Sequence, residues 1–156
     1  MIEAPLSKDG TAIIKVAAST GFFSQEEVDC VAELWNEYLQ KGADKSGYHF
    51  LIDHENGKLR GFACFGPRAL TKGAYDLFWI AVDKDCQRQG VGKALMDEAE
   101  KEIKHLGGRL VIVETSGKPK YGPTRKFYHS AGYTHEATLK DFYHEGDDLV
   151  IFTKKL

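Results

Sequence analysis

The chain has 156 residues, a length that suits one domain with a sizeable hydrophobic core. Its formal net charge of −2 argues against broad nucleic-acid binding, which draws on an excess of Lys and Arg. No apolar run approaches membrane-spanning length, and the first residues lack the basic and apolar regions of a signal peptide. We therefore expect residues 1–156 to form one globular domain without a membrane segment.

The first part of the chain predicts a lead-in, a strand and a helix. Residues 1–10 are expected to be frayed, and the moderately β-branched residues 11–17 predict a first strand. Ser24-Gln-Glu-Glu27 has the pattern of a capping box, in which two side chains satisfy free backbone groups at a helix start. Apolar residues at helical spacing follow, and this helix is predicted to end at Gly42.

The middle of the chain predicts a hairpin and a central strand. Residues 48–53 and 59–65 are apolar runs that flank Asn56-Gly57, which is the strongest short signal for a β-hairpin. Residues 74–82 are apolar on both faces, as expected of a strand in the interior of a sheet.

The last part predicts two helices and three strands. Apolar residues on one face predict a helix over 91–106, and 109–115 reads as another interior strand. A strand–helix–strand order with a connection of this length between the strands implies a right-handed crossover and parallel pairing. Pro123 to Gly132 predicts a short helix, and 133–144 with 149–153 predicts a final hairpin. The expected fold class is α/β, a mixed sheet in the order β-α-β-β-β-α-β-α-β-β.

A glycine motif, Gln87-x-x-Gly90-x-Gly92, stands where the strand 74–82 gives way to the following helix. Glycine lets the backbone approach a ligand closely, and the first turn of a helix presents unpaired N–H groups. With the helix dipole, these donors favour phosphate oxygens. A dinucleotide fingerprint would need a third glycine at Leu95, and a P-loop would need Ser or Thr at Ala94, so neither fits.

The motif resembles the acetyl-CoA pyrophosphate signature of the GCN5-related N-acetyltransferases (GNAT), (Arg/Gln)-x-x-Gly-x-(Gly/Ala). An ordinary strand–loop–helix connection with glycines at a tight turn is the alternative. The predicted order of elements is similar to the GNAT fold along nearly the whole chain, and in that fold the two parallel central strands splay apart. A second stretch supports the resemblance, because Tyr128, Gly132 and Tyr133 match the family's Tyr-x-x-x-Gly-(Phe/Tyr) signature.

The resemblance implies a cofactor site and a catalytic acid. The residues that it implies for acetyl-CoA binding are Ile80, Ala81, Val82, Gln87, Arg88, Gln89, Gly90, Val91, Gly92, Lys93, Tyr121 and Phe127. In the family the tyrosine at the position of Tyr128 points its hydroxyl at the CoA sulfur, where it can protonate the leaving thiolate. Tyr121 departs from the pattern, because family members often carry Asn there.

The general base is the less determined part of the predicted site. Glu114 ends an apolar strand, and some N-terminal acetyltransferases of the family place a glutamate base there; it could equally be a salt-bridge partner. Asp76, His49, a water relay and deprotonation in solution are further alternatives. The histidines have no cysteine or carboxylate at ligand spacing, so no metal is expected.

The sequence thus predicts an acetyl-CoA-dependent N-acetyltransferase that moves an acetyl group directly to a primary amine. It resembles a bacterial and archaeal subgroup of uncharacterised GNAT members. The alternatives are an acyl-CoA sensor or assembly module of the same fold without turnover, and a nucleotide-binding α/β domain. The acceptor could be a small molecule or a protein amine, and neither a membrane partner nor general nucleic-acid binding is expected.

The cysteines indicate the cellular compartment, and the large aromatic residues indicate the oligomeric state. Cys30, Cys64 and Cys86 are odd in number and widely spaced, which is typical of reduced thiols and predicts a cytoplasmic protein. Large aromatics exceed what the inner faces need, and the C-terminal hairpin offers an edge, so a homodimer is expected. The aromatics in question are Trp35, Tyr38, Phe142 and Tyr143.

Overall fold

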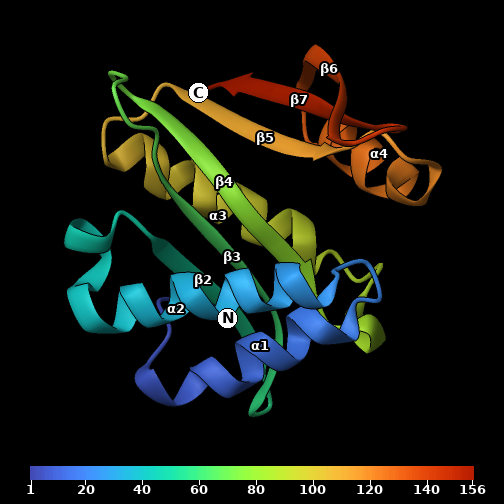
Figure 1. The fold of residues 1–156 in the computed structure, drawn as a ribbon. Coiled ribbons are helices and arrows are strands. Elements are labelled where there is room, and N and C mark those ends of the chain that lie inside the picture. Colours follow the sequence, from blue (N-terminus) through green and yellow to red (C-terminus); the bar gives the residue numbers. More distant parts are fainter.

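The computed structural model describes all residues from 1 to 156, which form a single mixed sheet with helices on both faces (Figure 1). The strands are β1 (Ile2–Glu3), β2 (His49–Glu55), β3 (Lys58–Pro67), β4 (Ala74–Val82), β5 (Leu110–Ser116), β6 (Thr134–His144) and β7 (Asp147–Lys155). The helices are α1 (Gly10–Ser19), α2 (Gln25–Ser46), α3 (Val91–His105) and α4 (Gly122–Ser130). The strand order in the sheet is β1-β2-β3-β4-β5-β7-β6.

The two central strands, β4 and β5, splay apart. They are the parallel pair of the sheet, and they pair only from Ala74↔Leu110 to Asp76↔Ile112. Beyond Asp76, β4 has no strand partner on the β5 side, and Figure 1 shows the two strands diverging toward α4. The predicted parallel crossover and the predicted splay are therefore confirmed, and the opening leaves main-chain groups of β4 free.

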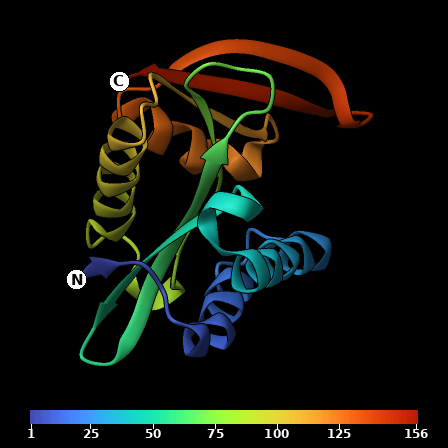
Figure 2. The same cartoon turned by 90° about the vertical axis from the view of Figure 1, so that its left-hand side faces the viewer.

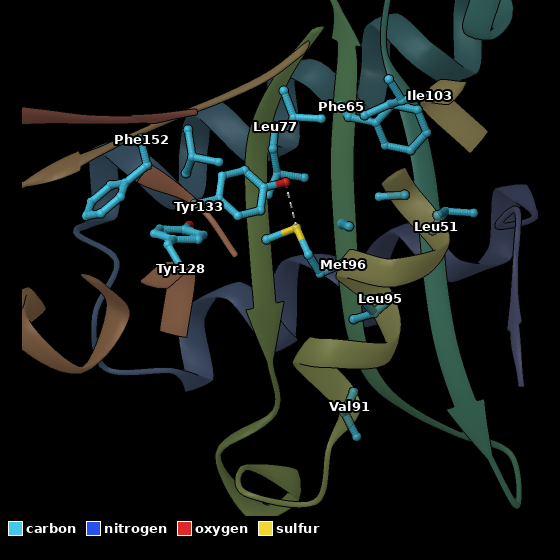
Figure 3. Close-up of a cluster of buried hydrophobic side chains, with 14 of the residues drawn as sticks. Leu51, Phe65, Leu77, Val91, Leu95, Met96, Ile103, Tyr128, Tyr133 and Phe152 are labelled. Carbon is cyan, nitrogen blue, oxygen red and sulfur yellow. Dashed lines mark hydrogen bonds between the residues drawn. The ribbon is translucent and has the colours of Figure 1, made fainter. Parts of the chain in front are cut away.

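Two hydrophobic clusters, one on each face of the sheet, hold the layers together. Helices α1 and α2 bury Ile13, Val31 and Trp35 against one face. On the other face α3 buries its apolar stripe, including Leu95 and Ile103, and the cluster continues to residues of α4 and β7 (Figure 3). Figure 2 shows α3 and the pair α1–α2 on opposite sides of the strands. This packing fixes the start of α3 and the side chains of α4 around the opening.

The prediction for the N-terminal region was wrong in two respects. Residues 1–10 are not a frayed lead-in, because Ile2 and Glu3 pair with β2 and a 3₁₀ turn follows at Ser7–Asp9. Residues 11–17 lie in α1 and are not a strand. Their buried residues are Ile13, Val16 and Ala17, and this i, i+3, i+4 spacing is helical. The β-branched content suggested a strand, but helical packing on the sheet decides the conformation.

The predictions for α2 are correct in part, and the prediction for the β2–β3 hairpin is correct. The Ser24 side chain accepts a hydrogen bond from the Glu27 N–H at 3.2 Å, as expected of a helix N-cap. Gly42 is non-helical, but it only interrupts α2, which continues to Ser46. In the β2–β3 turn, Asn56 and Gly57 both have positive φ, which is the geometry of the predicted two-residue hairpin.

Candidate active site

The glycine motif forms a turn that leaves backbone donors free at the start of α3. Gly90 is the N-cap residue and has a left-handed φ of 81°, which favours glycine. The first intrahelical hydrogen bond runs from the Ala94 N–H to the Gly90 carbonyl. The N–H groups of Val91, Gly92 and Lys93 therefore have no partner within the helix, and they lie at its positive end.

The surroundings of this turn fit a phosphate-bearing ligand. A Cβ added at Gly92 would lie 3.4 Å from the Phe127 ring and 3.5 Å from Val82, so α3, α4 and β4 meet there. The Arg88 and Lys93 side chains are exposed, and Lys93 forms an ion pair with Asp97. The open backbone donors and these two cations could hold a pyrophosphate.

The loop before α3 is braced by its own side chains. The Gln87 amide donates to the Val82 carbonyl at 3.4 Å, and the Gln89 amide donates to the Asp85 carbonyl at 3.2 Å. The two glutamines of the motif therefore hold the loop against the end of β4.

The end of β4 presents main-chain groups to the opening. Ile80, Ala81 and Val82 pair with β3 on one side and have no strand partner on the β5 side. The Ala81 side chain is buried on the α1–α2 face, whereas Ile80 and Val82 pack toward α3. A bulge at Phe78, which sequence reasoning missed, precedes this stretch, since Cys64 pairs with Trp79 and Phe65 with Leu77.

Tyr128 lies on α4 beside the opening, buried among Phe127, Tyr133 and Phe152 (Figure 3). Burial raises the pKa of its phenol well above the ordinary value of about 10. The hydroxyl is not fully enclosed, so it keeps some contact with solvent. A phenol in this state keeps its proton at neutral pH and can donate it to a thiolate, a far stronger base than water.

Glu114 projects from β5 with 39% of its side chain exposed and accepts a hydrogen bond from Arg68 at 3.4 Å. Arg68 binds Asp76 more closely, at 2.8 Å. The hydrogen bond and charge of Asp76, and then those of Glu114, raise the pKa of the Arg68 guanidinium. Arg68, which sequence reasoning missed, thus engages two of the candidate bases and leaves Glu114 the more open carboxylate.

His49, another candidate base, lies away from the opening. Its ring stacks on Phe65 at 5.2 Å between centroids, and burial lowers its pKa. It belongs to β2, which is separated from β4 by β3. The structure therefore does not bring His49 together with Tyr128 and the start of α3.

Residues 45–135 match the acetyltransferase (GNAT) domain family. The chain belongs to the GNAT family. As a GNAT member it is an acyltransferase, and this family uses acetyl-CoA as the acyl donor. The free N–H groups of the α3 turn and the open edge of β4 fit that donor.

The GNAT assignment agrees with similarity to known proteins. A protein of Desulfovibrio desulfuricans that is assigned to the GNAT family of acetyltransferases is 44% identical, with a TM-score of 0.96 over 99% of this chain and 98% of that one. The ribosomal protein bS18-alanine N-acetyltransferase of Escherichia coli is 33% identical over 97 residues, 60% of each chain. An uncharacterised N-acetyltransferase of Methanocaldococcus jannaschii is 23% identical, covering 85% of this chain and 88% of that one.

On the β5 side of the opening, Tyr143 of β6 is close enough to Glu114 of β5, Asp147 of β7 and Glu27 of α2 to be affected by their charges. A register shift between Leu139 and His144 makes residues 140–143 bulge from β6. Burial, then the charges of Glu114, Asp147 and Glu27, raise the pKa of Tyr143 to about 12. The charges of these three carboxylates act on the Tyr143 hydroxyl, so they supply negative charge on this side.

Tyr121 connects the same side to the α1–α2 loop. Its hydroxyl donates to the Phe22 carbonyl at 3.1 Å, and the two rings lie 6.3 Å apart between centroids. Tyr121 thus ties the loop before α4 to the loop before α2. Sequence reasoning placed Tyr121 only by its departure from the family pattern, and no local signal indicated its contact with Phe22.

No group of three or more His, Cys, Asp or Glu side chains is arranged to hold a metal ion. None of the helices combines the length and the apolar character that crossing a membrane requires.

Proposed function

We propose that this GNAT protein is an N-acetyltransferase that moves the acetyl group of acetyl-CoA directly to a primary amine. The observation that carries the proposal is the meeting of two features at one opening. The free N–H groups at the start of α3 lie beside Phe127 of α4. Phe127 is followed directly in α4 by the buried, protonated Tyr128. One feature suits binding of the CoA phosphates, and the other suits release of the CoA thiol.

In this proposal the chain positions the donor through its backbone. The N–H groups of residues 91–93 bind the pyrophosphate, with Arg88 and Lys93 adding positive charge. Free main-chain groups of residues 80–82 bind the pantetheine arm and the thioester carbonyl. A hydrogen bond to that carbonyl stabilises the negative charge that develops on its oxygen during attack. Acetyl-CoA, when bound, supplies the activated acetyl group.

The remaining steps are proton transfers by side chains of the chain. An alkylammonium acceptor has a pKa of about 10.4 and must lose a proton before it can attack. We propose that Glu114 removes that proton, directly or through water, because it is the more exposed of the two carboxylates that contact Arg68. The Tyr128 hydroxyl donates its proton to the departing sulfur, and the acetylated amine leaves on the acceptor side.

We propose a cationic amine as the acceptor. The support is the negative charge around Tyr143, where Glu27, Glu114 and Asp147 attract a protonated amine before it is deprotonated. The Escherichia coli relative, by its name, acetylates an alanine of a ribosomal protein. A protein amine and a small-molecule amine are both acceptors that this charge distribution suits.

We also propose the domain organisation, the oligomeric state and the cellular location of the protein. Residues 1–156 form one N-acetyltransferase domain, and the exposed apolar residues of β6 support a homodimer. Cys30, Cys64 and Cys86 are unpaired thiols, which supports a cytoplasmic location.

The test is release of free CoA from acetyl-CoA in the presence of an amine panel. The panel should contain an Ala-terminated peptide, a lysine peptide, a polyamine and an aminoglycoside, with a thermal shift measured for acetyl-CoA, NAD and ATP. We expect protection by acetyl-CoA alone and CoA release with at least one amine. Protection by acetyl-CoA without release for any amine would favour the sensor, and protection by NAD or ATP would favour a nucleotide-binding domain.

A further inference from the structure

A second pocket lies at the open edge of the sheet, away from the acetyl-transfer opening. Strand β1 covers β2 only at Ile52 and Asp53, so the outer edge of β2 is uncovered from His49 to Leu51. A cavity of about 280 Å³ occupies this place. Its lining residues are Ile2, Glu3, Ala4, Tyr38, Ala43, His49, Phe50, Leu51, Phe65, Glu98 and Glu102. None of them belongs to the proposed acetyl-transfer site.

The floor of this edge pocket is apolar and aromatic. Phe50, Leu51 and Phe65 are buried core residues, so their positions are fixed by packing on both faces of the sheet. The His49 ring lies flat on Phe65, with an interplanar angle of 10°, and burial lowers its pKa. The imidazole therefore favours its neutral form, and the floor suits the body of an apolar molecule.

The charged groups at the edge pocket are carboxylates. Glu3, Glu98 and Glu102 line it, and the lining contains no lysine or arginine. Glu3 pairs with His54 at 2.7 Å and Glu98 with Lys101 at 3.2 Å, whereas Glu102 has no ion-pair partner. Glu102 is half-buried, lines the cavity and has no ion-pair partner, and its charge acts on His49, as does that of Asp44.

We propose that the edge pocket is a binding site for a small organic cation, an ammonium group carried on an apolar aryl or alkyl body. The apolar floor takes the body, and Glu102, assisted by Glu98, takes the ammonium group. No side chain forms an ion pair with Glu102, so a bound cation would supply the missing positive charge. This charge complementarity selects a cation over an anion. The cavity holds a molecule of fragment size. The inference does not rest on the proposed acetyl transfer.

The test uses a probe that cannot be acetylated, (2-phenylethyl)trimethylammonium, because its quaternary nitrogen has no proton to lose. Binding is followed residue by residue through backbone amide shifts of the full-length protein. We expect saturable shifts at Leu51, Phe65 and Glu102, and none with 3-phenylpropanoate, an anion of similar size. Glu102→Gln should weaken probe binding about five- to tenfold, since it removes one partly screened carboxylate.

A matched variant separates loss of this charge from a general change of net charge. Glu136 is exposed on β6, far along the sheet from the edge pocket, so Glu136→Gln should leave probe affinity unchanged. Three results would each overturn the inference: shifts confined to Glu114 and Tyr143, equal binding of the anion, or unchanged affinity in a folded Glu102→Gln protein.

Discussion

At the residue scale, the site combines a phenol held in its acid form with a carboxylate held near solvent. Burial raises the pKa of Tyr128, so its proton remains in place throughout the pH range in which amines become nucleophilic. Glu114 instead remains 39% exposed beside Arg68. The two groups can therefore act in opposite directions at the same pH, one as acid and the other as base.

Replacing Glu114 tests the base assignment. Glu114→Gln should depress kcat most at low pH, where free amine is scarce, and least as the pH approaches the pKa of the amine itself. The measurement is a pH–rate profile with one identified acceptor, with acetyl-CoA affinity determined separately. Glu136→Gln, on the exposed strand β6, is the control and should follow the wild-type profile. A loss that is constant across pH would assign Glu114 to substrate binding or structure.

The residues that the sequence predicts are those whose role follows from their neighbours in the chain. Gly90 and Gly92 belong to a six-residue motif at a strand–helix junction, and Tyr128 to a helix that ends at a glycine. Arg68 and Tyr143 escape such reasoning, since Arg68 reaches Glu114 across 46 residues and Tyr143 depends on a register shift in β6. Only tertiary pairing brings these side chains to the opening.

At the element scale, α2 begins at a cap whose contribution can be measured. The Ser24 side chain accepts from the Glu27 N–H, which would otherwise have no partner within the helix. Ser24→Ala should lower the free energy of unfolding by about 1 kcal/mol. Because the domain is of ordinary size, thermal denaturation should show a midpoint lower by about 2–4 °C. An unchanged midpoint would show that the cap contributes nothing to α2.

The first turn of α3 is the element on which binding of acetyl-CoA depends in this account. Gly92→Ala places its Cβ at ordinary contact distance from Phe127, so it should be mild in stability and affinity. Gly92→Val adds two methyl groups near the free N–H donors and should weaken acetyl-CoA binding by at least about tenfold, about 1.4 kcal/mol. Calorimetric titration of both variants gives the comparison. Wild-type affinity in a folded Gly92→Val protein would exclude this turn as the phosphate site.

Misassignment of α1 shows where element prediction fails. Its apolar residues satisfy a helical spacing, but the run is short and β-branched, so local propensity favours a strand. The strand that begins the sheet is instead the two-residue β1, which is too short to give a periodic signal. An element with a full helical period, such as α3, is predicted within a residue or two of its observed bounds.

At the scale of the whole molecule, the splay of β4 and β5 could be predicted only through the family resemblance. Both strands read as continuous apolar runs, and nothing in their composition says where the pairing stops. The structure limits the pairing to three residue pairs. Beyond them α4 and its Tyr128 lie beside the opening, and the connection between β5 and α4 is tied down by Tyr121 at the Phe22 carbonyl.

The edge strand β6 predicts self-association. All its residues are exposed, and among them are the apolar Leu139, Phe142 and Tyr143. An exposed, apolar edge strand is a site for pairing with another chain, and a homodimer covers it. Light scattering at micromolar concentration should give the dimer mass, and Leu139→Lys should shift the equilibrium toward monomer. A monomeric mass for the wild-type protein would contradict the expectation.

The central claim is that Tyr128 protonates the CoA thiolate as the acetyl group leaves, and one variant tests it most directly. Tyr128→Phe keeps the buried ring and removes only the hydroxyl, so the fold and acetyl-CoA affinity should remain close to wild type. Its kcat should fall by about 10²–10⁴-fold, measured in single turnover so that chemistry is observed. A Tyr128→Phe protein with intact acetyl-CoA binding and wild-type single-turnover rate would contradict the account.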